Sequence, residues 1–166
     1  MEQFATFELT PKMRLDIDAW VNKFPPEKKS SAVIAALTIV QNQESWLSLP
    51  MMNAVADYLQ MPQSAVYEVA TFYSMFNLEP TGQYRIDVCT NVSCMLCGCD
   101  TIVAHLKERL NIGFGETTKD GRFTLKEVEC LAACGGAPAL QVDGQYHEHL
   151  TPEKVDAILA RLEAKA

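Results

Sequence analysis

The cysteines of this chain are gathered in two short stretches, and no other feature constrains its fold and chemistry as strongly. The sequence contains six cysteines. They lie in CTNVSCMLCGC, residues 89–99, and in CLAAC, residues 130–134. Cysteines that only fill a core are scattered singly, as other small hydrophobes are. Thiolates that hold a soft metal centre must converge, so they occur as closely spaced pairs on loops. The sequence therefore predicts a site with thiolate ligands.

The N-terminal sequence and the charge restrict the class of protein further. The first residues, MEQFATFE, have neither the basic and apolar regions of a secretory signal nor the Arg-rich character of a transit peptide. In a reducing compartment, cysteine pairs more often bind metal or catalyse than form structural disulfides. No run approaches the ~18 apolar residues of a membrane span, so we expect a soluble protein that is able to dock on a membrane-bound assembly. The net charge of -7 argues against nucleic-acid binding, which needs a basic face.

The hydropathy pattern divides the chain near Pro80, and the first part is helical. Apolar residues recur there at helix spacing, which predicts four short helices with brief connections. The predicted helices run from Met13 to Phe24, ended by Pro25-Pro26; from Val33 past Val40, ended by Pro50; over residues 51–59; and from Pro62 to Phe76. We therefore expect a small helical bundle over residues 1–80.

After Gly82 the pattern alternates as in strands. The predicted elements are a strand over 84–88, a helix over 101–110, a strand over 122–128, strands over 139–142 and 145–148 around an Asp143-Gly144 turn, and a closing helix after Thr151-Pro152. The order β-α-β-β-β-α is compatible with a thioredoxin-like α/β domain over residues 81–166. The predicted fold class is therefore α+β. Both cysteine stretches begin where a strand ends, so the two loops are expected to face one site.

The cysteine spacing is compatible with several sites. They are a [2Fe-2S] cluster held by Cys89, Cys94, Cys130 and Cys134; a plant-type set of Cys89, Cys94, Cys97 and one downstream cysteine; a zinc site of Cys94, Cys97, Cys130 and Cys134; and a thioredoxin-type redox pair, Cys94 with Cys97. Spacing alone does not separate the first two. The plant-type set leaves Cys130 or Cys134 unexplained, and the redox pair leaves both without a role. Rieske-type ligation is excluded because no histidine adjoins a cysteine pair, and we expect His147 and His149 at the surface.

Several motifs in order along the chain resemble one known family. They are VATFYSMF at residues 69–76, VCT leading to Cys94, DGRFTL at 120–125, ECLAAC at 129–134 leading to Ala137-Pro138, and HLTPE at 149–153. Together they resemble the thioredoxin-like [2Fe-2S] subunit of the NADH-oxidising module of respiratory complex I, NADH:quinone oxidoreductase. Related subunits serve NAD-linked hydrogenases and formate dehydrogenases. The resemblance covers nearly the whole chain.

The resemblance implies a ligand set and a function. Cys89, Cys94, Cys130 and Cys134 would hold one [2Fe-2S] cluster, whereas Cys97 and Cys99 depart from the family pattern and are expected to be bystanders. The chain would be a non-catalytic electron-transfer subunit of an oxidoreductase, held by the complex at the cytoplasmic face of a bacterial inner membrane. FMN and NADH would belong to a partner flavoprotein subunit, because no GxGxxG follows a strand here. The N-terminal bundle would dock on that partner.

The residue types around the cysteines suit this chemistry. Iron and sulfide prefer thiolate donors. Main-chain N–H groups in loops 90–93 and 131–133 are expected to donate to the sulfurs, and Gly135-Gly136 to let the second loop approach the cluster. Acidic residues nearby disfavour an added electron, so we expect a low potential. Rival hypotheses are the disulfide oxidoreductase and a zinc-stabilised binding module.

Overall fold

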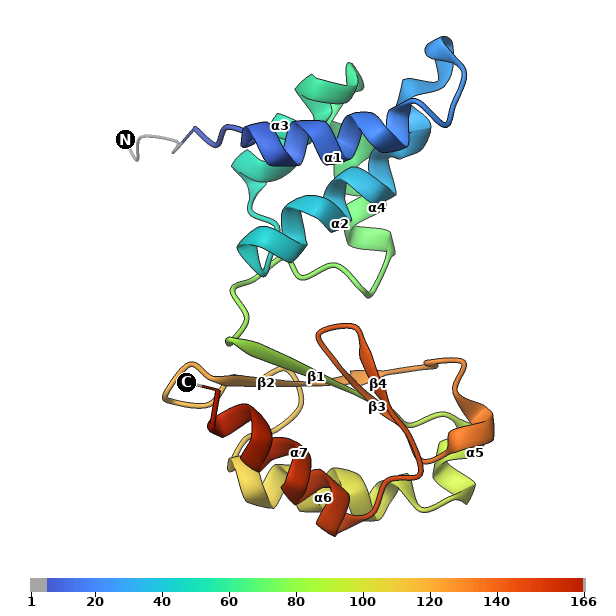
Figure 1. The fold of residues 1–166 in the computed structure, drawn as a ribbon, viewed down its shortest axis with the longest axis vertical. Helices are drawn as coiled ribbons and strands as arrows, with labels where there is room; N and C mark the ends of the chain where they lie inside the picture. The colour runs from blue at the N-terminus through green and yellow to red at the C-terminus, as the bar shows by residue number, and fades with distance from the viewer. Residues whose placement is uncertain (1–5, 166) are drawn as a thin grey trace. The chain divides into compact units, whose positions relative to one another are not determined.

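The structure, a computed structural model, describes residues 6–165 (Figure 1). The chain forms two compact units, Met1–Pro80 and Thr81–Ala166, each with its own core. No helix in the described part of the chain is long and apolar enough to cross a membrane. The mixed α+β class predicted from the sequence is confirmed.

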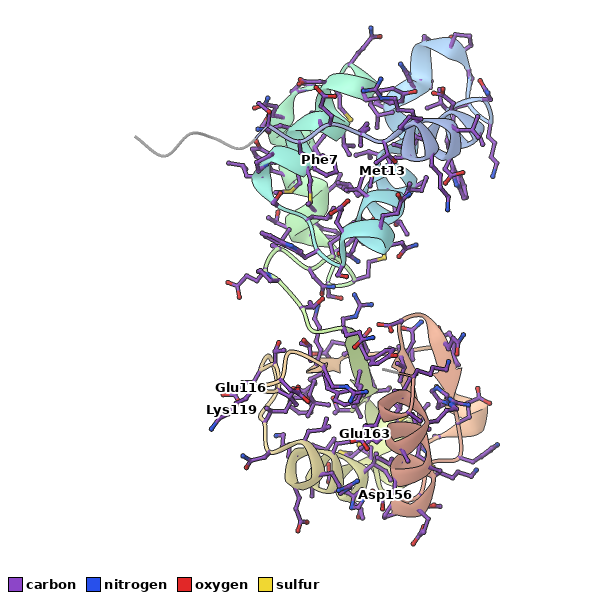
Figure 2. All side chains as sticks on the ribbon, turned by 60° about the vertical axis from the view of Figure 1, so that its left-hand side comes forward. Phe7, Met13, Glu116, Lys119, Asp156 and Glu163 are labelled. Carbon is purple, nitrogen blue, oxygen red and sulfur yellow. The ribbon has the colours of Figure 1, made fainter. Side chains whose placement is uncertain are left out.

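The first unit is a bundle of short helices. Its elements are α1 (Pro11–Val21), the 3-10 helix η1 (Pro26–Ala32), α2 (Val33–Glu44), α3 (Leu49–Leu59) and α4 (Gln63–Phe72). Helix α1 begins where Thr10 Oγ1 accepts a hydrogen bond from the amide of Met13 at 3.1 Å. Met13 lies in the bundle core (Figure 2). The largest fully buried side chains of this core are Met13, Ile17, Leu37, Val40, Leu47, Val55 and Leu59.

Several predicted helix boundaries of the bundle were wrong, and at Pro26 and Pro50 the reason is that a proline begins a helix as readily as it ends one. Pro50 lies in the first turn of α3, where its missing N–H costs nothing, and α2 has already ended at Glu44 before the left-handed Ser45 (φ 70°). Pro26 likewise begins η1, while α1 ends earlier, at Val21. Helix α4 ends at Phe72 rather than Phe76.

The segment after α4 is fixed to the bundle by a buried amide. The Gln41 side chain donates to the carbonyl oxygen of Met75 at 2.9 Å, and its Oε1 accepts from the amide of Asn77 at 2.6 Å. Phe76 is buried here as a loop residue. The spacing of Phe76 in the sequence matched that of the helical residues before it because its side chain enters the same core. It does so from a loop and not from a helix.

The second unit is a four-stranded mixed sheet with two helices on one face (Figure 1). Its elements are β1 (Tyr84–Cys89), α5 (Val92–Leu96), α6 (Cys99–Leu110), β2 (Phe123–Val128), the 3-10 turn η2 (Cys134–Gly136), β3 (Leu140–Val142), β4 (Gln145–His147) and α7 (Pro152–Glu163). The strand order is β2-β1-β3-β4, with β1 and β2 parallel and the other pairs antiparallel. Helices α6 and α7 cover a core that includes Ile86, Leu106, Leu125, Leu140 and Leu159.

The predicted hairpin is present, with Asp143 (φ 46°) and Gly144 (φ 87°) both in the left-handed region that its turn requires. The helix α5 was not predicted, because five residues are too few to show a helical period. Helix α6 begins at Cys99, after the left-handed Gly98 (φ 86°), and not at residue 101.

The strand pairing positions the two cysteine loops. Cys89 lies opposite Val128 in the parallel register of β1 and β2. Parallel strands end at the same edge of a sheet, so the chain leaves both strands at one place. The loop after β1 carries Cys94, and the loop after β2 carries Cys130 and Cys134.

Candidate metal centre

A small cavity lies between the two cysteine loops. Its volume is about 80 Å³. The lining residues are Cys89, Asn91, Ser93, Cys94, Cys130, Leu131, Ala132, Ala133, Cys134 and Ala139. Two thiols come from each loop. Cys97 and Cys99 are not among the lining residues, although they follow Cys94 closely in the sequence.

Cys89, the last residue of β1, contacts the backbone of the segments on both sides of it, the one before β3 and the one after β2. Its amide donates to the carbonyl oxygen of Ala139 at 3.2 Å. The next amide, of Thr90, donates to the carbonyl oxygen of Val128 at 3.3 Å and so extends the pairing of the two loops beyond the strands. The Cys89 Sγ lies 3.8 Å from the main-chain oxygen of Glu129. The first sulfur is thus fixed against the backbone of the second loop.

The short helix α5 directs Cys94 inward. The side chain of Asn91 accepts a hydrogen bond from the amide of Val92 at 2.7 Å, which caps the helix. Cys94 is buried, and burial together with hydrogen bonding to Cys89 raises the pKa of its thiol to about 11. The Cys94 thiol is therefore held in its neutral form until a cation binds, since a bound metal deprotonates a coordinating thiol.

The second loop is more open. Cys130 and Cys134 are both exposed. Ala132 adopts a left-handed conformation (φ 56°), and its amide donates to Cys130 Sγ at 3.3 Å. This is an N–H···S contact of the kind expected from loop 131–133. Such donors stabilise negative charge on a ligand sulfur.

The two glycines of the second loop have different surroundings. A Cβ at Gly136 would lie 2.5 Å from Cδ and 2.6 Å from Cβ of Glu148, so a larger residue at this position would have to displace Glu148. A Cβ at Gly135 would meet no atom within 4 Å. The close approach at Gly136 is therefore to the side chain of Glu148, just after the hairpin, a contact that no local sequence pattern indicates.

Cys97 and Cys99 differ from each other in burial. Cys97 is exposed at the C-terminal cap of α5. Cys99 is only 1% exposed and packs in a buried cluster with Cys89, Cys94 and Leu131. Burial, and secondarily the Asp100 carboxylate, raise the pKa of the Cys99 thiol. The plant-type set, the zinc set and the redox pair all require Cys97, which does not share the cavity with Cys94.

The thiol arrangement also bears on the kind of metal group. Within residues 6–165, no three His, Cys, Asp or Glu side chains converge closely enough to hold a single metal ion. The four cavity thiols instead come in two pairs, Cys89 with Cys94 from one segment and Cys130 with Cys134 from the other. A donor set of this kind fits a [2Fe-2S] cluster, in which each iron takes two protein thiolates. His149 is exposed and His147 is half-buried, and neither lines the cavity.

Several acidic residues are close in sequence to the cavity cysteines. Asp87, two residues before Cys89, is buried, and its Oδ2 accepts from Nε of Arg85 at 2.9 Å. Burial raises the pKa of the Asp87 carboxyl, although the Arg85 charge opposes this shift. Glu127 and Glu129, on the strand and loop that lead to Cys130, are both exposed.

A mixed sheet covered on one face, with paired thiols from two strand-end loops around one cavity, defines a thioredoxin-like metal-binding protein of the iron–sulfur class. The chain belongs to the thioredoxin-like [2Fe-2S] ferredoxin family, whose pattern matches residues 17–163. The [2Fe-2S] cluster predicted as the cofactor is the group that characterises this family, so the cofactor and the family resemblance are both confirmed.

Named relatives cover most of the chain. The chain is 48% identical over 143 residues to a subunit of the NADH-quinone oxidoreductase of Rickettsia bellii, covering 86% of each sequence. It is 43% identical over 152 residues to the corresponding NADH-quinone oxidoreductase subunit of Rhizobium meliloti, covering 92% of this chain and 89% of the relative.

A solved structure shares the fold. The NAD+-reducing [NiFe]-hydrogenase in the air-oxidized state superposes with a TM-score of 0.67 at 22% sequence identity. The similarity covers 78% of this chain and 23% of the hydrogenase chain, so this chain corresponds to about a quarter of that polypeptide. At this level of identity the comparison supports the fold and nothing finer.

Proposed function

We propose that this chain is the electron-transfer subunit that carries one [2Fe-2S] cluster in the NADH-oxidising flavin module of an NADH:quinone oxidoreductase. The observation that carries this proposal is the cavity shared by Cys89, Cys94, Cys130 and Cys134. The names of the relatives at 43% to 48% identity supply the type of complex. When bound, a [2Fe-2S] cluster accepts and releases one electron at a time.

The protein residues hold and tune the site. Cys89 and Cys94 are the ligands from the first loop, and Cys130 and Cys134 those from the second. The Ala132 amide stabilises charge on the Cys130 sulfur, whereas the carboxylates of Asp87, Glu127 and Glu129 disfavour added negative charge. The carboxylates favour a low reduction potential, and the amide contact acts in the opposite direction.

The bundle over residues 1–80 has a docking role in this proposal. Near the end of α4 and just beyond it, Phe72, Tyr73, Met75 and Leu78 are all exposed, Phe72 to 78%. Trp20 is 43% exposed, whereas Phe76 is buried inside the bundle. Contiguous exposed apolar side chains mark interaction surfaces. The partner is the flavoprotein subunit, which binds FMN and NADH, and the assembly holds the chain at the cytoplasmic face of the membrane.

An equivalent subunit of an NAD-linked hydrogenase or formate dehydrogenase is the second candidate function. The NAD+-reducing [NiFe]-hydrogenase contains a region of the same fold, and at 22% identity the likeness is one of fold alone. The relatives named as NADH-quinone oxidoreductase subunits are about twice as similar in sequence. We therefore assign the NADH:quinone oxidoreductase.

Purification and reduction test the function. The chain purified anaerobically is expected to be brown, to contain iron and acid-labile sulfide in equal amounts, and to give a [2Fe-2S] EPR signal on reduction. NADH is expected to reduce it only after addition of the flavoprotein subunit. A colourless protein that contains zinc, or one that reduces disulfides through Cys94 and Cys97, would overturn the proposal.

A further inference from the structure

A second cavity of the second unit lies between the end of β4 and helix α7. Its volume is about 310 Å³, and it shares no lining residue with the thiol cavity. We call it the β4–α7 pocket. Proteins bind small ligands in cavities of roughly 300 to 1,000 Å³, so this pocket is large enough for a small organic molecule. Electron transfer at the thiol cavity gives the β4–α7 pocket no role.

The helical wall of the pocket is one stripe of α7. Lys154, Ala157, Ile158 and Arg161 all line the pocket. Residues at spacings of three, four and seven lie on one side of a helix. The stripe of α7 that is buried in the core is a different one and consists of Val155, Leu159 and Leu162. The pocket therefore presents the side of α7 that the core leaves free.

The strand wall of the pocket is His147, the last residue of β4. His147 pairs with Leu140, whose side chain lies in the core covered by α6 and α7. Paired residues of neighbouring strands point to the same face of a sheet, so the His147 ring points toward α7. The buried Leu150 also lines the pocket, and with Ala157 and Ile158 it forms an apolar lining beside the charged groups.

The charged lining of the pocket is positive, although the net charge of the chain is -7. Lys154 and Arg161 contribute two positive charges, and Glu148 contributes one negative charge. In the described part of the chain, neither Lys154 nor Arg161 forms an ion pair. The carboxylate of Asp156, on the same helix, is already bonded to two residues of α6, at 3.0 Å and 2.8 Å. The two cations of the pocket are thus available to an anion from solution.

We propose that the β4–α7 pocket binds a small organic phosphate of the size of a mononucleotide, with the phosphate group on Lys154 and Arg161 and the organic part against the apolar lining. Lysine and arginine both donate charge-assisted hydrogen bonds to phosphate oxygens. Two cations also match a phosphate monoester, which carries nearly two negative charges at neutral pH. The carboxylate of Glu148 is placed to accept from a sugar hydroxyl, as an acidic residue does in dinucleotide sites.

Binding is tested on the full-length, cluster-loaded protein with AMP as the probe. The chain has three histidines, so few ring signals appear in an NMR spectrum of the isotope-labelled protein. AMP is expected to shift the signal of His147 and to leave that of His105 unchanged, because His105 bonds to Asp156 and does not line the pocket. Burial, and secondarily the charge of Arg161, lower the pKa of His147, and a bound phosphate is expected to raise it.

Two variants and a matched control locate the binding. Lys154→Gln and Arg161→Gln each remove one positive charge from the pocket, and each is expected to weaken AMP binding about tenfold. Lys119→Gln removes the same charge from an exposed residue outside the pocket and is expected to bind AMP as the wild type does. The visible spectrum of the cluster is expected to be the same in all three.

Two further probes separate the parts of the ligand. Inorganic phosphate is expected to shift the same His147 signal with lower affinity than AMP, and adenosine, which lacks the phosphate, is expected to leave it unchanged. An unshifted His147 signal at millimolar AMP would overturn the proposal, and so would an equal loss of affinity in Lys119→Gln. Equal affinities for AMP and inorganic phosphate would overturn the role of the apolar lining and, with it, the organic ligand.

Discussion

The Sγ atom of Cys89 lies 3.8 Å from the main-chain oxygen of Glu129, although forty residues separate them in the sequence. The contact joins the end of β1 to the start of the second cysteine loop. It exists because β1 and β2 are parallel and in register to their last residues, Cys89 and Val128. The pairing of β1 with β2 therefore holds the starts of the two cysteine loops next to each other. Little further conformational entropy has to be lost to bring the paired thiols together.

Replacing each proposed ligand by serine tests the ligand set. Serine keeps nearly the same shape but exchanges a soft thiolate for a poor, hard ligand. Cys89→Ser, Cys94→Ser, Cys130→Ser and Cys134→Ser are each expected to lose or strongly alter the visible absorbance and the EPR signal. Cys97→Ser is the control and is expected to keep both, because Cys97 is exposed and does not line the cavity. Loss of the signal in Cys97→Ser, with retention in Cys130→Ser or Cys134→Ser, would favour plant-type ligation.

Cys99 is expected to matter for stability rather than for ligation. It packs against the buried thiols but does not line the cavity. Cys99→Ala is expected to retain the [2Fe-2S] spectrum and to lower the free energy of unfolding by about 1 kcal/mol, because it leaves a small void. Chemical denaturation followed by circular dichroism measures the loss. A missing cluster in a folded Cys99→Ala protein would show that the thiol acts at the metal.

Two neighbouring glycines provide a matched pair for the second loop. Gly136→Ala forces a Cβ into the Glu148 side chain and is expected to cost about 1–3 kcal/mol of stability. Gly135→Ala meets no atom within 4 Å and is expected to leave stability unchanged. The melting temperature of each variant measures its stability, and the iron content, measured in parallel, shows whether each variant still binds the cluster. Equal stability of the two variants would show that Glu148 moves aside freely.

The exposed aromatic at the end of α4 tests the docking role of the bundle. Phe72→Ser is expected to leave the cluster spectrum intact and to weaken co-purification with the flavoprotein subunit about tenfold, since aromatic side chains often dominate interface affinity. Leu15→Ser, on α1, changes a side chain that is 71% exposed and serves as the control. Undiminished co-purification of the Phe72→Ser protein would remove this residue from the interface.

A surface carboxylate that joins α6 to α7 predicts a pH dependence. Asp156, labelled in Figure 2, accepts from His105 at 3.0 Å and from Arg109 at 2.8 Å. These hydrogen bonds, that of His105 above all, hold the pKa of Asp156 below its ordinary value. A depressed folded-state pKa gives stability that is present above the unfolded-state pKa and is lost as pH falls through the folded-state pKa.

Asp156→Asn is therefore expected to be less stable than the wild type near neutral pH, with the difference disappearing in acid. Urea unfolding at a series of pH values measures it. Glu108→Gln, which changes an exposed carboxylate on the neighbouring helix α6, is the control and is expected to show a smaller and flatter difference. A stability difference for Asp156→Asn that persists unchanged into acid would show that the carboxylate charge contributes nothing.

The sequence by itself determined the local elements and the chemistry. Alternation and the Asp143-Gly144 pair identified the strands and hairpin, because a strand's side chains alternate between its two faces and the turn conformation is set by its own two residues. Clustered cysteines identified soft-metal chemistry, and the motif resemblance identified the family. Helix boundaries at Pro26 and Pro50 were misassigned, because a proline is compatible with either side of a helix start.

Only the tertiary structure showed which four of the six thiols line one cavity. Cys94, Cys97 and Cys99 lie within six residues of one another, and spacing left more than one ligand set open. The unforeseen helix α5 turns Cys94 into the cavity and Cys97 to the surface, while the start of α6 buries Cys99 behind them. Which side a thiol faces depends on helix phase, and which loops meet depends on strand register. Both are set by long-range packing, which no local pattern in the sequence records.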